Sequence, residues 1–109
     1  MHKGMYEIIK EITDWQDKIF TEATPLSAAI HLTREALEVQ QSAKLRMQGL
    51  NLELADVFLL TVAVAHLSGI DLEAAIERKM AINRNRTWGP MDAEGVVEHI
   101  DTLPKMLDV

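Results

Sequence analysis

Residues 52–67, LELADVFLLTVAVAHL, are apolar at 12 of their 16 positions, and the four exceptions are Glu53, Asp56, Thr61 and His66. The segment has no polar–apolar alternation of the kind that strands show, and its length suits a helix. A helix that is apolar on nearly all sides is usually covered by others, so we expect it to be the central helix of the fold. With two acids in 16 residues, it is expected to be too short and too charged to span a membrane.

Helical patterns also precede this central segment. An apolar i, i+3, i+4 stripe predicts a first helix at residues 5–20. Thr24 and Pro25 then form a cap followed by a proline at the first helical position, which starts a second helix that continues to about Met47. Gly49 separates that helix from the central one.

The remaining turns and helices follow the same logic. Asn51 could cap the central helix, and Gly69 ends it. Asp71 could cap a fourth helix at residues 72–86, and the tail has room for one short helix at residues 93–100. The sequence therefore predicts an all-α fold, a four-helix bundle with a short C-terminal helix.

The composition fits a single domain that comprises residues 1–109. The chain is 48% hydrophobic, with 17 acidic and 11 basic residues and a formal net charge of −6. Nucleic-acid polymers and anionic membranes bind through clustered lysine and arginine, so we expect neither as a partner. The lack of cysteine excludes disulfide scaffolds, thiolate zinc sites and cysteine nucleophiles. The N-terminal sequence lacks the features of a signal peptide, so we expect a cytoplasmic protein.

The central helix also bears on assembly. Four helices of this length enclose only a small core. The central helix has more apolar circumference than one such bundle can cover. We therefore expect at least a homodimer, with part of the apolar surface buried between subunits.

Two pairs of acidic residues recur at helical spacing. Glu35 and Glu38 lie three residues apart in the second predicted helix, which places both carboxylates on one face. On its own, such a pair is usually a solvated surface feature. Glu53 and Asp56 repeat the spacing in the most apolar segment, where no lysine or arginine is present. Charges buried there must be paired, protonated or bound to metal.

In an antiparallel helical hairpin the two acidic pairs can face each other, and four carboxylates without a soft ligand suit Mg²⁺ or Mn²⁺. A ferritin-like di-iron site requires glutamate three residues before histidine, where this chain has alanine or valine (Ala28, Ala63 and Val96). The H-E-x-x-H zinc motif is absent. We therefore predict a magnesium or manganese site formed by Glu35, Glu38, Glu53 and Asp56.

A row of polar and basic residues, Lys79, Asn83 and Arg86, follows one face of the fourth predicted helix. Cations near a helix C-terminus also complement the helix dipole, and this alternative stays open for the row by itself. Beside a site of four carboxylates, the row matches the needs of a polyphosphate. Metal ions would neutralise the bridging oxygens and basic side chains the terminal ones.

Candidate contacts with a base lie on the first helix. Trp15 and Phe20 could stack on a base, although aromatic residues on an apolar stripe more often belong to a core. Gln16 could form a hydrogen bond with a base edge, and the alternative is a solvated surface glutamine. His31, one turn before Glu35, is expected to orient that carboxylate rather than to bind metal.

These motifs together resemble a known family. Glu35-x-x-Glu38, then 14 residues, then Glu53-x-x-Asp56 resembles the E-x-x-E…E-x-x-D signature of the MazG-like all-α nucleoside triphosphate pyrophosphohydrolases. The K-M-x-x-N-x-x-R run at residues 79–86 is similar to part of that superfamily's fourth helix. The W…T-P…H-L-x-x-E opening and the R-T-W-G and G-V-V-E-H segments resemble its phage and bacterial dATP/dGTP diphosphohydrolase branch. The resemblance covers about residues 8–100.

The resemblance implies metal-dependent hydrolysis of a (deoxy)nucleoside triphosphate, with the purines dGTP and dATP preferred, to the monophosphate and pyrophosphate. It implies that the four acids hold Mg²⁺ or Mn²⁺, and we expect Glu38 or Glu35 to orient or deprotonate the attacking water. The family's usual assembly is a homodimer or a homotetramer built as a dimer of dimers. A phage-encoded member would act in the host cytoplasm.

For substrate binding, the resemblance implies phosphate contacts from the fourth helix and part of a base pocket from the first. The resemblance assigns Lys79, Asn83 and Arg86 to the phosphates. Within the first helix, we expect Trp15, Gln16 and Phe20 to contact the base.

The chain departs from the family pattern in one place, and two alternatives stay open. Many members have two adjacent acids at the start of the first motif, whereas Arg34 precedes Glu35 here. The substrate could instead be dUTP, dCTP or a damaged nucleotide. A non-catalytic helical module that senses nucleotides or binds a partner is the second alternative, but such a module has no need for two acids in its most apolar helix.

Overall fold

The computed structural model of the chain describes residues 3–100. It forms two compact units, Met1–Leu72 and Glu73–Val109. The single domain predicted for residues 1–109 includes residues 1–2 and 101–109, which lie outside the described residues, and it stays a prediction.

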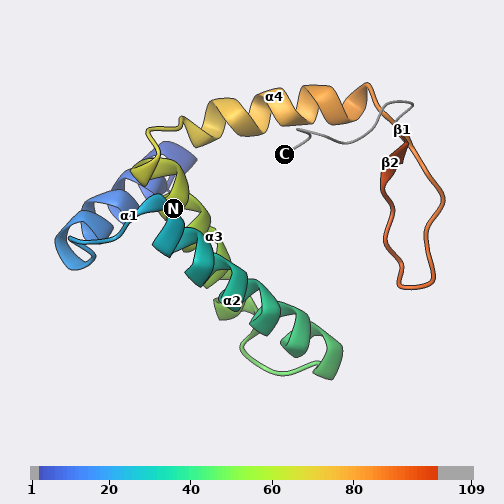
Figure 1. Cartoon of the computed structure of the whole chain (residues 1–109), viewed down its shortest axis with the longest axis horizontal. Helices are drawn as coiled ribbons and strands as arrows, with labels where there is room; N and C mark the ends of the chain where they lie inside the picture. The colour runs from blue at the N-terminus through green and yellow to red at the C-terminus, as the bar shows by residue number, and fades with distance from the viewer. Residues whose placement is uncertain (1–2, 101–109) are drawn as a thin grey trace. The chain divides into compact units, whose positions relative to one another are not determined.

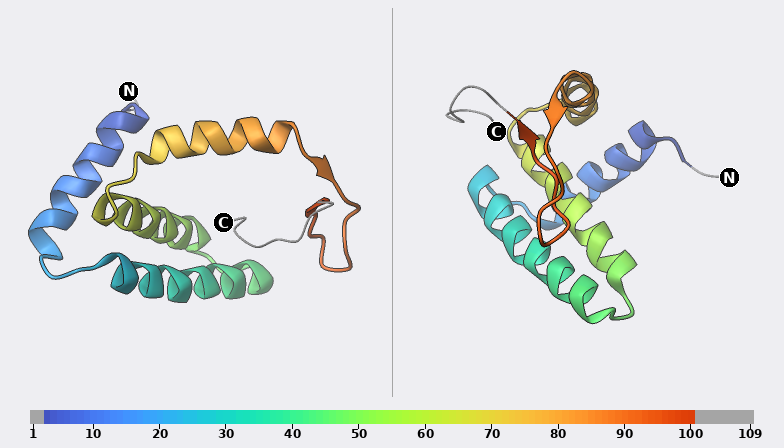
Figure 2. Two further views of the ribbon diagram at one scale, coloured as in Figure 1. Left: turned by 45° about the horizontal axis from the view of Figure 1, so that its top comes forward. Right: turned by 90° about the vertical axis from the view of Figure 1, so that its right-hand side faces the viewer.

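The first unit consists of three helices, α1 (Met5–Ile19), α2 (Pro25–Leu45) and α3 (Leu50–Leu67). A short turn joins α2 to α3, and the two helices lie side by side as an antiparallel hairpin (Figures 1 and 2). α3 also packs against α1. The predicted central segment is therefore the one helix of this unit that has extensive contacts with both others.

The start of α2 follows its sequence closely. The hydroxyl of Thr24 accepts a hydrogen bond from the backbone N–H of Ser27 at 3.0 Å, and the Thr24 N–H donates to Ser27 Oγ at 2.9 Å. Pro25 occupies the first helical turn, where its missing N–H costs no hydrogen bond. This reciprocal cap confirms the predicted start.

The other helix boundaries differ from the prediction by one or two residues. α3 begins at Leu50, so Asn51 lies inside the helix and Gly49, with φ of +91°, takes the N-cap position. Glycine adopts this left-handed conformation without a steric penalty. The helix is 18 residues long and, by length and composition alone, sufficient to cross a membrane, so the expectation that it is too short is wrong. Core helices of soluble proteins can have the same length and composition.

The core of the first unit is small. Ala28 on α2 is buried, as are Val62 and Ala65 on α3, and Val62 is only 1% exposed. Ser42, 3% exposed, is the other small residue that α2 buries. These short side chains allow close approach of the two helices. Only 17% of α3 is buried within the chain, so its apolar surface is far from fully covered.

The second unit contains α4 (Leu72–Arg84), whose first residue ends the first unit, and two short strands. Strands β1 (Thr87–Trp88) and β2 (His99–Ile100) pair antiparallel, with Thr87 opposite Ile100 and Trp88 opposite His99. Residues 3–100 are thus mostly helical and contain four helices, as predicted, but only three of these helices belong to one compact unit. The short helix predicted at residues 93–100 is wrong.

Hydrogen bonds in the turn and two glycines account for the β1–β2 hairpin. Asp92 Oδ1 accepts hydrogen bonds from the N–H groups of Glu94 and Val96, both at 2.9 Å. Gly95 has φ of +82°, which a helix cannot contain. A Cβ at Gly89 would lie 3.3 Å from the carbonyl oxygen of Glu98, so the close approach of the two strands favours glycine there.

Candidate active site

The four predicted acids come from the two helices of the hairpin, Glu35 and Glu38 from α2 and Glu53 and Asp56 from α3. Glu38 has a pKa above its ordinary value of 4.5, chiefly because its carboxyl group shares a hydrogen bond with Glu35 and is repelled by it. Desolvation and weaker repulsion from Glu53 and Asp56 act in the same direction. The hairpin therefore brings all four acids into one electrostatic neighbourhood.

Glu53 differs from an ordinary solvated surface acid. Its Oε2 atom is buried and has no hydrogen-bond partner among residues 3–100. No lysine or arginine occurs between Leu50 and Leu67. A buried carboxylate oxygen without a partner is costly, and a divalent cation is one group that would satisfy it.

Oxygen donors alone make up this set, which is the ligand chemistry that Mg²⁺ and Mn²⁺ prefer. Within residues 3–100, no three His, Asp or Glu side chains are arranged closely enough to form a complete metal cluster. Like charges repel one another, so a shared proton or a cation must offset the repulsion where these carboxylates converge. The donor set and the orphaned oxygen fit a divalent ion.

A histidine borders the acids. His31 Nε2 lies 3.2 Å from Oε1 of Glu35, one turn later on α2, and the Glu35 side chain is only 19% exposed. A partner of this kind restricts the orientations of a carboxylate. His31 therefore lies where the sequence predicted it.

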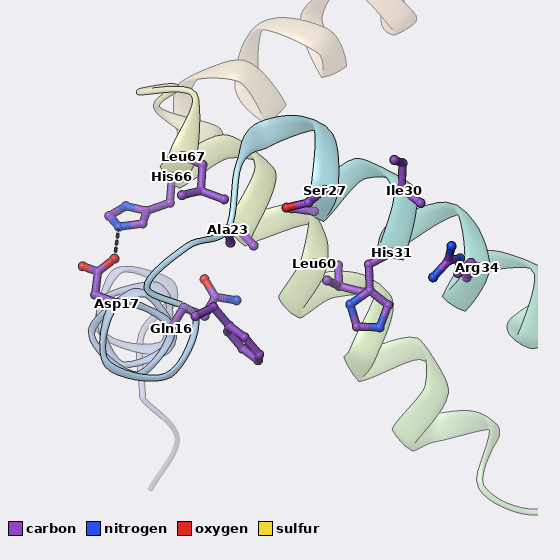
Figure 3. Close-up of a pocket in the computed structure, with 13 residues that line it drawn as sticks. Gln16, Asp17, Ala23, Ser27, Ile30, His31, Arg34, Leu60, His66 and Leu67 are labelled. Carbon is purple, nitrogen blue, oxygen red and sulfur yellow. Dashed lines mark hydrogen bonds and ion pairs between the residues drawn. The ribbon is translucent and has the colours of Figure 1, made fainter.

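Beside the acids, a pocket of about 460 Å³ opens between α1, α2 and α3 (Figure 3). Its walls are mainly apolar, and its polar side chains lie toward the ends. At one end His66 Nε2 lies 2.9 Å from Asp17 Oδ1, and at the other His31 and Arg34 project from α2. Because His31 contacts both this pocket and Glu35, the pocket adjoins the acidic site. The apolar side chains that line it include Phe20, Ala28, Ile30, Leu60, Ala63 and Leu67.

The candidate base contacts on α1 separate in the structure. Gln16 and Phe20 line the pocket. Trp15 lies on another side of α1 and packs its ring edge-to-face against Phe20, with centroids 5.4 Å apart. Gln16 is only 7% exposed, so the alternative of a solvated surface glutamine is wrong. The geometry places Phe20 as a wall of the pocket and Trp15 as a support behind it.

Three polar residues of the pocket had no assigned role in the sequence analysis. The contact between Asp17 and His66 joins residues 49 positions apart in sequence, which no local pattern reveals. The one visible sign was His66 itself, a polar residue in an otherwise apolar segment. The sequence analysis identified Arg34 only as a departure from the family pattern, in which many members have an acid at this position.

Lys79, Asn83 and Arg86, the predicted phosphate contacts, belong to the second unit. α4 ends at Arg84, so Arg86 follows the helix rather than continuing its face. Arg86 Nη1 lies 3.3 Å from Nδ1 of His99. Asn83 has a buried Oδ1 without a hydrogen-bond partner in the described part of the chain, and its backbone oxygen accepts from Trp88 Nε1 at 3.1 Å. The β1–β2 hairpin therefore contacts the end of this row through Trp88 and His99.

Comparisons with known proteins identify the family of this chain. Residues 8–105 match the family model of dATP/dGTP pyrophosphohydrolases. A dATP/dGTP diphosphohydrolase of Salmonella phage PMBT28 is 33% identical over 94 residues, which are 86% of this chain and 31% of that protein. The dATP/dGTP diphosphohydrolase of Cyanophage S-2L is 34% identical over 94 residues, 86% of each chain. The chain thus spans about a third of the phage PMBT28 protein and most of the cyanophage one.

A solved structure shares the fold. It is the MazG-like pyrophosphohydrolase of Cyanophage S-2L bound to dGDP and three catalytic Mn²⁺ ions per active site. The TM-score is 0.75 at 31% identity, and the match covers 91% of this chain and 95% of that one. The likeness extends over both compact units of this chain.

Proposed function

This chain belongs to the dATP/dGTP pyrophosphohydrolase family, and we propose that it hydrolyses dATP and dGTP to the monophosphate and pyrophosphate in a reaction that requires Mg²⁺ or Mn²⁺. The observation that carries the proposal is the juxtaposition on α2 and α3 of four acids with an adjoining apolar pocket. A triphosphate needs metal ligands and a nucleoside needs an apolar cavity with a few polar groups.

In this proposal Glu35, Glu38, Glu53 and Asp56 hold the metal ions. When bound, such ions neutralise the triphosphate and make water more acidic. Glu38 or Glu35 would accept a proton from the attacking water. His31 keeps Glu35 oriented through its contact at 3.2 Å. The remaining acids then hold the substrate's metal ions.

The pocket on the first unit would take the nucleoside. Phe20 offers an aromatic wall and Gln16 a buried amide, and Trp15 supports the Phe20 ring from behind. Arg34 and His31 lie at the end of the pocket that adjoins the acids, so a nucleotide would place its base away from them and its phosphates toward them. In the second unit, Lys79, Asn83 and Arg86 would contact the phosphates.

The exposed apolar surface supports assembly as a homodimer or a dimer of dimers. Leu26 and Leu37 on α2 are 70% and 61% exposed, and Leu52 on α3 is 68% exposed. Several exposed leucines on two packed helices are typical of subunit interfaces. Light scattering on the purified protein measures the assembly directly, and a monomer at micromolar concentration would contradict this part of the proposal.

The experiment that tests the activity is a panel of ribo- and deoxynucleoside triphosphates with Mg²⁺ or Mn²⁺, with the products separated by chromatography. We expect dATP and dGTP to have the highest kcat/KM and to give monophosphate and pyrophosphate in equal amounts. Release of orthophosphate and a diphosphate would contradict the reaction. Highest activity on dCTP, dUTP or a damaged nucleotide would contradict only the purine assignment, and binding without turnover would favour a nucleotide-sensing module.

A further inference from the structure

The side chain of Arg86 is in contact with the β1–β2 hairpin. It is half-buried, although the neighbouring Arg84 is exposed. Its Nη1 atom lies 3.3 Å from Nδ1 of His99, in a part-buried contact between residues 13 positions apart. A guanidinium only donates hydrogen bonds, so Nδ1 of His99 is the acceptor and carries no proton in this contact. His99 therefore restricts the orientation of the Arg86 guanidinium.

His99 is itself held by a second aromatic residue. It lies opposite Trp88 in the antiparallel pair of strands, so the two side chains project from the same face of the hairpin. Their rings pack edge-to-face, with centroids 5.8 Å apart and planes at 87°. The indole Nε1 of Trp88 donates a hydrogen bond to the backbone oxygen of Asn83 at 3.1 Å. Contacts therefore lead from the end of α4 through Trp88 and His99 to Arg86.

The backbone of Arg86 is bound at the same carbonyl. Its N–H donates to the Asn83 oxygen at 3.3 Å, so this oxygen accepts hydrogen bonds from both Arg86 and Trp88. Carbonyl groups in the last turn of a helix lack partners within the helix, which leaves them available for such bonds. Arg86 is thus anchored by its backbone to α4 and by its guanidinium to the hairpin.

Resting on the proposed function, we infer that His99 is a positioning residue, which holds the guanidinium of Arg86 ready for the phosphates of the nucleotide. A free arginine side chain loses rotational freedom when it binds a phosphate. A guanidinium that is already oriented loses less of it. His99 acts in this way without touching the substrate, and the hairpin gains a role in a reaction whose metal ligands lie elsewhere.

Two substitutions separate the acceptor of His99 from its ring. His99→Asn keeps an acceptor close to the Nδ1 position and loses the ring, while His99→Phe keeps a ring against Trp88 and loses the acceptor. We expect kcat/KM for dATP and dGTP to fall about fivefold in His99→Phe, the effect of one hydrogen bond, and to stay within about twofold of wild type in His99→Asn. In an Arg86→Gln background, His99→Phe causes no further loss, because it acts through the arginine.

A second measurement follows the arginine without turnover. Nitrogen NMR relaxation of the Arg86 Nε–H group, assigned by comparison with Arg86→Gln, reports fast motion of this side chain. We expect an ordered Arg86 in wild-type protein and in His99→Asn, and a mobile one in His99→Phe. The exposed Arg84 is the reference side chain in each protein.

Each other outcome overturns the inference. Equal losses of kcat/KM in His99→Asn and His99→Phe mean that the ring only stabilises the hairpin. Wild-type kcat/KM in His99→Phe, or a further loss in the Arg86→Gln background, excludes action through Arg86. An Arg86 side chain as mobile as Arg84 in wild-type protein excludes it without any variant, even if His99→Phe fails to fold. If wild-type protein hydrolyses neither dATP nor dGTP, the proposed function fails and the positioning role fails with it, which is distinct from hydrolysis that does not depend on His99.

Discussion

Nε2 of His31 lies 3.2 Å from Oε1 of Glu35, and this contact joins the pocket between α1, α2 and α3 to the acidic site. The histidine lines the pocket, while the carboxylate it touches is one of the proposed metal ligands. One residue is therefore positioned to influence metal binding without being a ligand.

The first prediction follows from that contact. His31→Ala should raise the Mn²⁺ concentration needed for half-maximal activity about tenfold, because partners of metal ligands contribute this much to affinity. His31→Gln, which keeps a hydrogen-bonding group, should lose less. Metal titrations of activity measure the shift, and an unchanged Mn²⁺ requirement in His31→Ala would show that Glu35 does not depend on the contact.

The second prediction concerns Glu53. Glu53→Gln should abolish turnover, since it removes a metal ligand, yet it should raise the melting temperature of the metal-free protein by relieving repulsion among the acids. Activity assays and thermal unfolding with EDTA measure both effects. Glu22→Gln, the same change at an exposed turn position, should alter neither. Substantial activity in both Glu53→Gln and Asp56→Asn would refute the site of four carboxylates.

The third prediction concerns pH. The pKa of Glu38 is raised in the folded protein by Glu35 and the other acids, so the folded state holds this proton more tightly than the unfolded chain does. Its stabilising contribution is therefore complete below the ordinary pKa of 4.5 and is lost as the pH rises through the raised value. Without metal, Glu38→Gln should thus be more stable than wild type at neutral pH, and the difference should vanish below about pH 4.5. A difference that grows on acidification would contradict the assigned cause.

The fourth prediction concerns the β1–β2 hairpin. Asp92→Ala removes the acceptor of two backbone hydrogen bonds, from Glu94 and Val96, so it should loosen the turn between β1 and β2. Amide hydrogen exchange at Gly89, whose N–H donates to Glu98 O at 2.8 Å, should accelerate several-fold, while exchange in α3 stays unchanged. Glu94→Ala, which leaves the Asp92 acceptor intact, is the matched control. Equal protection at Gly89 in all three proteins would show that the hairpin does not need this turn.

How much the sequence predicted depends on whether a feature is local. The four helices and the Thr24 cap follow from periodicity and from residues a few positions apart, and the structure confirms them. The electrostatic coupling of Glu38 with Glu53 and Asp56 was predictable because helical spacing and a short turn determine which faces meet. The family was predictable from the same motif, as the family model and the relatives confirm.

Features that depend on distant contacts were not predictable. The burial of Gln16 results from packing against Leu59, 43 residues later. The pairing of β1 with β2 involves strands of two residues each, too short for any alternation to be visible. The assembly, the cytoplasmic location and the lack of a membrane or nucleic-acid partner stay predictions.

α3 carries parts of both the acidic site and the pocket. Asp56 and the pocket residue Ala63 are seven residues apart on this helix, which is about 10 Å along its axis. A continuous helix is stiff over this length, so in the proposed function the helix backbone, and not a loop, would set the distance between the metal-binding acids and the base. Substitutions on α1 can then change which base is accepted while the reacting end keeps its place. A change of base preference would then require substitutions on α1 and none among the metal-binding acids.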